Sequence, residues 1–91
     1  MQSISQVMPL VIAELLRGSP MSPGKVDFAW KVAVGPAMER VTAIRLEGRV
    51  LLVEAKTTAW GREVSRSSAM ILRRMRALLG EDAIAEVRLR A

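Results

Sequence analysis

In one stretch of this 91-residue chain, the spacing of the apolar residues changes from that of a helix to the two-residue repeat of a β-strand. This change restricts the possible folds more than any other feature of the sequence. Between Ala43 and Ala55 the side chains follow a two-residue repeat, in which successive residues belong to opposite faces of a strand. The pair Glu47-Gly48 interrupts this repeat as a two-residue turn. The pattern predicts a β-hairpin. Its second half, which begins at Val50, is rich in apolar residues on both faces, which is typical of the central strand of a small sheet.

Helical periodicity precedes the hairpin in two segments. Apolar residues at helical spacing predict a first helix over about residues 4–17. Ser22 followed by Pro23 indicates an N-cap with proline at the first helical position, and this begins a second helix. Gly35-Pro36 predicts a break near Val34, with one or two further turns through Val41.

The longest periodic segment follows the hairpin and spans residues 59–79. Its apolar stripe begins at Trp60, and Gly80 is placed to cap its C-terminus. Alternation from Ala85 to Leu89 then predicts a last strand that pairs with the hairpin. We therefore expect one α+β domain over residues 1–91, with the order α-α-β-β-α-β and a small three-stranded sheet packed against helices.

The missing residue types exclude most enzyme chemistry. The chain has no His, Cys, Tyr or Asn, which removes zinc sites of Cys and His, disulfides, and catalytic arrangements that need His or Cys. We expect a non-enzymatic protein without a metal or another cofactor. The first sixteen residues contain no Lys or Arg, and the longest apolar run, Val7 to Ala13, is too short to cross a membrane. A cytoplasmic protein without a membrane partner is expected.

The net charge of +5 comes from one part of the chain. Between residues 56 and 76 there are six basic residues and one acid, whereas basic and acidic residues nearly balance elsewhere. A localised excess of this kind favours a polyanionic partner. The six basic residues are Lys56, Arg62, Arg66, Arg73, Arg74 and Arg76.

On a single helix, four of these arginines would form one ridge. At 100° per residue, Arg62, Arg66, Arg73 and Arg76 fall within about 40° of one line, opposite the apolar stripe. Arg74 flanks the ridge, and Lys56 precedes the helix. Such a ridge would contact phosphates along single- or double-stranded DNA without reading its sequence. The alternative is that the ridge is only a solvated face of the helix.

The aromatic residues give no support to base recognition. Phe28, Trp30 and Trp60 are the only ones, and both tryptophans lie on apolar helical faces, where we expect them in the core. The surface of the first two predicted helices offers a partner contact instead. Its candidate residues are Met8, Leu16, Met21, Phe28 and Met38.

The chain resembles the DciA family over nearly its whole length, from about Ile4 to Arg90. The resemblance rests on Phe28-Ala29-Trp30-Lys31-Val32-Ala33-Val34-Gly35, on Gly48-Arg49-Val50-Leu51-Leu52-Val53, on Thr58-Ala59-Trp60, and on Leu78-Leu79-Gly80 ahead of Val87-Arg88-Leu89-Arg90. It implies a KH-like domain that binds DNA and helps to load or operate the replicative DnaB-type helicase. The Gly-x-x-Gly loop of true KH domains is missing, so the nucleotide clamp of those domains is not implied.

Two other functions fit the same residues. A small basic α+β domain is also used by RNA-binding ribosome maturation factors. A protein-interaction domain that does not bind nucleic acid would need the arginines only for solubility. Binding of DNA and of ribosomal RNA at matched salt distinguishes these three functions.

Overall fold

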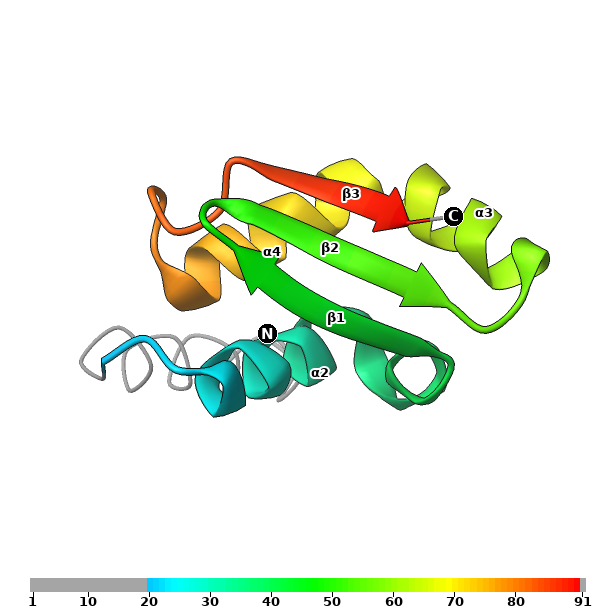
Figure 1. Ribbon diagram of the computed structural model, residues 1–91, viewed down its shortest axis with the longest axis horizontal. Coiled ribbons are helices and arrows are strands. Elements are labelled where there is room, and N and C mark those ends of the chain that lie inside the picture. The colour runs from blue at the N-terminus through cyan, green and yellow to red at the C-terminus, as the bar shows by residue number, and fades with distance from the viewer. Residues whose placement is uncertain (1–19, 91) are drawn as a thin grey trace, which may run out of the picture.

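The computed structural model describes residues 20–90, and the helix predicted over residues 4–17 lies outside them. In Figure 1 the described helices lie behind a three-stranded sheet, and no element of residues 20–90 covers the other face of the sheet. The α+β class and the small sheet packed against helices are confirmed. The elements are α2 (Pro23–Arg40), β1 (Thr42–Glu47), β2 (Val50–Ala55), α3 (Thr58–Arg66), α4 (Ser68–Leu79) and β3 (Glu86–Arg90).

Helix α2 begins and bends where the sequence predicts. The Ser22 side chain accepts a hydrogen bond from the amide of Lys25 at 3.1 Å, and Pro23 occupies the first turn. Gly35 leaves helical geometry with φ of 84° and ψ of 169°. A residue that precedes proline avoids the α region, and glycine alone adopts this positive φ without strain. The break before Pro36 is therefore built into the local sequence.

The hairpin and the central position of β2 are confirmed, but the turn lies one residue later than predicted. Glu47 pairs with Val50, so the two loop residues are Gly48 and Arg49. Gly48 has φ of 59°, whereas Arg49 has no positive φ, as a type II′ turn requires. Strand β2 pairs antiparallel with β1 and parallel with β3. The last predicted strand therefore pairs with the hairpin as expected.

The prediction of one continuous helix over residues 59–79 is wrong. The helix is interrupted at Ser67, where φ is −95° and ψ is 5°, and α3 and α4 are separate elements (Figure 1). Three serines surround the interruption, at positions 65, 67 and 68. Serine side chains compete for backbone hydrogen bonds and favour caps over helix interiors. The break lets α3 pack on β2 while α4 packs on α2.

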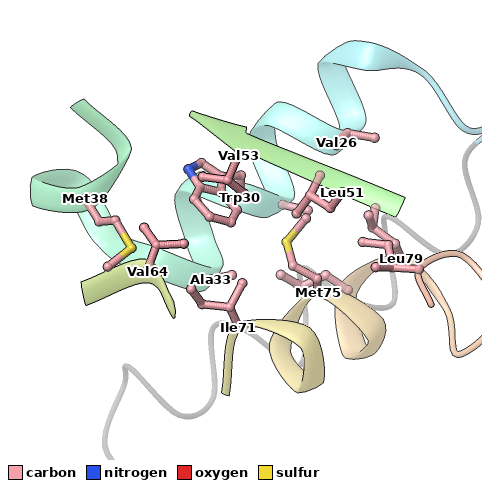
Figure 2. Close-up of a cluster of buried hydrophobic side chains, with 13 residues drawn as sticks. Val26, Trp30, Ala33, Met38, Leu51, Val53, Val64, Ile71, Met75 and Leu79 are labelled. Atoms are coloured by element: carbon pink, nitrogen blue, oxygen red, sulfur yellow. The ribbon is translucent and has the colours of Figure 1, made fainter. Parts of the chain in front are cut away.

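Side chains from α2, β2, α3 and α4 meet in one core (Figure 2). Trp30 is 2% exposed, which confirms its predicted core position. Its indole Nε1 donates to Thr42 Oγ1 at 2.9 Å, and that hydroxyl donates to the Met38 carbonyl at 2.8 Å. The buried polar end of the indole is thereby satisfied. The other fully buried side chains include Leu51, Val53, Ile71 and Met75.

Two expectations about apolar residues need correction. Trp60 is only half-buried, and it borders an open hollow of about 430 Å³ together with Val34 and Ala37. It packs against the edge of the core instead of filling it. Met38 is buried and is not part of an exposed partner surface, whereas Met21 and Phe28 are exposed. Met8 and Leu16 lie outside the described residues.

Candidate nucleic-acid interface

Two of the six predicted site residues brace the fold. Arg74 Nη1 donates to the carbonyl of Ala33 at 2.8 Å and so joins α4 to α2. Arg76 Nε donates to the carbonyl of Ile84 at 2.9 Å, and its Nη2 donates to that of Ala85 at 3.3 Å. These carbonyls lie outside regular secondary structure or next to a break, where the backbone lacks its usual partners. The two arginines therefore hold the segments around α4 together.

The other four basic residues are exposed. Lys56 lies in the loop between β2 and α3, Arg62 and Arg66 lie on α3, and Arg73 lies on α4. Arg66 approaches Glu63 at 3.5 Å, one turn away, with its side chain 75% exposed. Within residues 20–90, no acidic group pairs with Lys56, Arg62 or Arg73. These side chains are free to contact an anion.

The single arginine ridge expected from a helical wheel does not form. That geometry needs one unbroken helix from Arg62 to Arg76, and the helix is interrupted at Ser67. We call these four exposed basic residues, Lys56, Arg62, Arg66 and Arg73, the cationic surface; they lie in the loop before α3, on α3 and on α4. The serines around the break are compatible with an interruption, but by themselves they do not outweigh the apolar periodicity that predicts a continuous helix.

The arginines on the open face of the sheet differ from these residues because each of them forms an ion pair with a glutamate. Arg45 pairs with Glu47, Arg88 pairs with Glu86 at 2.6 Å, and Arg90 pairs with Glu54 at 3.4 Å. Each arginine of this face has an acidic partner, so the face has no net charge from these residues. The strand register places Glu54 opposite Ala43 and beside Arg90. Alternation along the strands already puts these charges on one face, and the sequence reasoning did not use that signal.

A hollow of about 620 Å³ lies where β2 and β3 end beside α3. We call it the strand-end hollow. Lys56 and Arg62 line it together with the hydroxyl-bearing side chains of Thr58 and Ser65 and the apolar side chain of Leu89. It brings together two residues of the cationic surface, Lys56 and Arg62. Sequence reasoning missed Leu89, Thr58 and Ser65, because their proximity depends on the parallel pairing of β2 with β3.

Residues 20–90 meet neither the requirements of a metal site nor those of a membrane-spanning helix. No group of three or more acidic side chains is placed to hold a metal ion in that part of the chain. Of the helices described, none has the length and apolar character needed to cross a membrane.

The fold is a small α+β domain with exposed basic residues on α3 and α4 and with ion-paired arginines on its strands. A family model described as "Dna[CI] antecedent, DciA" matches residues 3–89. The chain therefore belongs to the DciA family, whose role in DNA replication is related to loading of the replicative helicase. Neither the curated proteins nor the solved structures contain a significant match.

Proposed function

We propose that this chain is a non-enzymatic DNA-binding factor that associates with the DnaB-type replicative helicase and helps to load or operate it at the start of replication. Membership of the DciA family supports the connection to the helicase. The observation that supports DNA binding is the uneven pairing of arginines, which are neutralised on the open sheet and exposed without partners at Arg62 and Arg73.

The chemistry of the cationic surface fits phosphates and not base edges. Guanidinium groups bind phosphate oxygens in a bidentate fashion, and each phosphate that a cation neutralises releases a counterion. Trp30 is buried, and Trp60 is half-buried and packs against the core. Binding is therefore expected to be independent of base sequence and strongly dependent on salt.

Fluorescence anisotropy of labelled oligonucleotides over a salt series tests the DNA-binding part. If all four residues of the cationic surface contact phosphates, a plot of log affinity against log salt should have a slope of roughly −3 to −4. Ribosomal RNA fragments at the same salt concentrations provide the comparison. Tighter binding to the RNA would instead favour a ribosome maturation factor, and no salt-dependent binding to either would favour a pure protein-interaction domain.

The helicase contact is proposed to involve the exposed apolar residues of the α2 region. Met21 is 48% exposed and Phe28 is 46% exposed, and a contiguous apolar patch that included them would be the kind of surface that binds a protein partner. Phe28→Ser should weaken capture of the purified replicative helicase without changing the affinity for DNA. Lys31→Ser, an exposed change on the same helix, is the control. If both variants and the unmodified chain capture the helicase equally well, Phe28 is not part of the helicase contact.

A further inference from the structure

We propose that the strand-end hollow holds one nucleotide of single-stranded DNA, with a phosphate between Lys56 and Arg62 and the base against Leu89. The inference rests on the proposed DNA binding and adds a strand preference and a particular contact to it. It follows from the charge of the hollow, its polar lining and the one exposed apolar side chain within it.

The charge of the hollow comes from Lys56 and Arg62. Arg90 also borders the hollow, but its Nη1 lies 3.4 Å from Glu54 Oε1, so its charge is offset. Lys56 immediately follows β2, and Arg62 lies one helical turn after Thr58 on the side of α3 that faces the hollow. Two cations without acidic partners within residues 20–90 therefore border the same space, and charge-assisted hydrogen bonds from both would favour a phosphate group there.

Hydroxyl groups add hydrogen-bond donors near these cations. Thr58 and Ser65 line the hollow two turns apart on α3. Thr57 lines it as well, and its Oγ1 accepts a hydrogen bond from the Trp60 amide at 3.1 Å, which leaves the hydroxyl proton available to a ligand. Threonine and serine hydroxyls commonly donate to phosphate and sugar oxygens of DNA.

Leu89 gives the hollow an apolar surface. It is 37% exposed, and Met21 and Phe28, the other large apolar side chains of residues 20–90 with comparable exposure, do not line this hollow. Gly61 makes room for it, because a Cβ atom at position 61 would lie 3.2 Å from Leu89 Cδ2. The absence of a side chain on α3 at this point lets Leu89 extend along the hollow.

This combination fits a single strand better than a duplex. In a duplex the bases are stacked and paired, so a protein surface meets mainly phosphates and groove edges. In a single strand a base can leave the stack and lie against an apolar side chain while its phosphate contacts cations. A volume of about 620 Å³ is also within the usual range for sites that enclose small ligands.

The test compares two single strands that differ only in their bases. One is an oligothymidylate of about twelve nucleotides, a length that a small single-strand-binding domain can cover, and the other is an abasic strand with the same number of phosphates. The unmodified chain should bind the oligothymidylate about fivefold more tightly than the abasic strand, a modest value for one base against an aliphatic side chain. Leu89→Ser should remove that difference and leave binding to the abasic strand unchanged.

Phe28→Ser is the matched control, because it changes an apolar side chain of similar exposure that does not line the hollow. It should preserve the fivefold difference. Thermal unfolding shows whether Leu89→Ser remains folded, and Leu89→Ala replaces it if it does not. The comparison of the two strands with the unmodified chain does not depend on either variant.

Equal, salt-dependent binding of both strands by the unmodified chain would overturn the base contact while leaving DNA binding intact. A preference for oligothymidylate that survives in Leu89→Ser and Leu89→Ala would place the base elsewhere and would also overturn it. Failure of the chain to bind either strand would instead remove the proposed DNA binding itself, and this inference with it.

Discussion

The open face of the sheet and the cationic surface around α3 contain the same kind of side chain in opposite states. On the sheet, Arg45 and Arg88 each lie two residues from a glutamate on the same strand, and alternation turns both members of each pair to one side. On the helices, Arg62 and Arg73 have no acidic partner within residues 20–90. The comparison shows that the number of arginines on a surface does not decide whether that surface can attract a polyanion. What matters is whether the strand or helix repeat places an acidic residue on the same face as each arginine.

The largest expected effect separates these two surfaces directly. The double substitution Arg62→Gln with Arg73→Gln removes two unpaired cations, so the salt slope should become less steep by about 1.4 to 1.8. At about 0.1 M salt, this corresponds to a loss of roughly thirtyfold or more in DNA affinity. Fluorescence anisotropy measures both quantities, and the melting temperature should stay nearly unchanged because both side chains are exposed.

The matched control removes two paired arginines from the sheet. Arg45→Gln with Arg88→Gln lowers the net charge by the same amount and should reduce the affinity far less, since each arginine is already neutralised by a glutamate. Equal losses in the two double variants would show that DNA responds only to total charge and that no localised surface exists.

A second prediction concerns an arginine that sequence reasoning placed on the DNA ridge. Arg76→Gln should lower the free energy of unfolding by about 1 to 2 kcal/mol, because the carbonyls of Ile84 and Ala85 lose their charged donor. Denaturant unfolding measures this. Arg73→Gln on the same helix should be close to neutral, since Arg73 is exposed and forms no ion pair with any residue between positions 20 and 90. If Arg76→Gln is as stable as Arg73→Gln, the bracing role of Arg76 is wrong.

The smallest expected effect comes from removing the acidic partner of one arginine on the sheet. Glu86→Gln leaves Arg88 without its acid, but exposed ion pairs contribute little, so the free energy of unfolding should change by less than about 0.5 kcal/mol. DNA affinity should rise by no more than about twofold, because a single added charge lies away from the cationic surface. A gain as large as the loss in the α3 and α4 double variant would mean that DNA also binds the sheet.

The parts of the fold that depend on local chemistry were predictable from the sequence. The N-cap at Ser22, the break before Pro36 and the hairpin each follow from a few adjacent residues. The turn was misplaced by one residue because two registers put a glycine in the loop, and only the pairing of Glu47 with Val50 decides between them. Local signals therefore fix which elements exist more firmly than their register.

The parts that depend on tertiary packing were not predictable. The break at Ser67 opposes a strong apolar periodicity, and it is stabilised by the different surfaces on which α3 and α4 pack. For the same reason, no local pattern indicates that Arg74 and Arg76 bind distant carbonyls. Five of the six predicted site residues, all but Arg76, nevertheless lie exposed. Those on α3 and α4 do so because charged residues opposite an apolar stripe face solvent whether or not the helix is continuous.

The most direct test of the central claim is chemical-shift mapping of the chain by NMR during titration with single-stranded DNA. The account predicts that backbone and side-chain signals of Lys56, Arg62 and Arg73 shift with added DNA, and that those of Arg45 and Arg88 on the open sheet stay in place. Shifts confined to Arg45 and Arg88, with Arg62 and Arg73 unaffected, would contradict it.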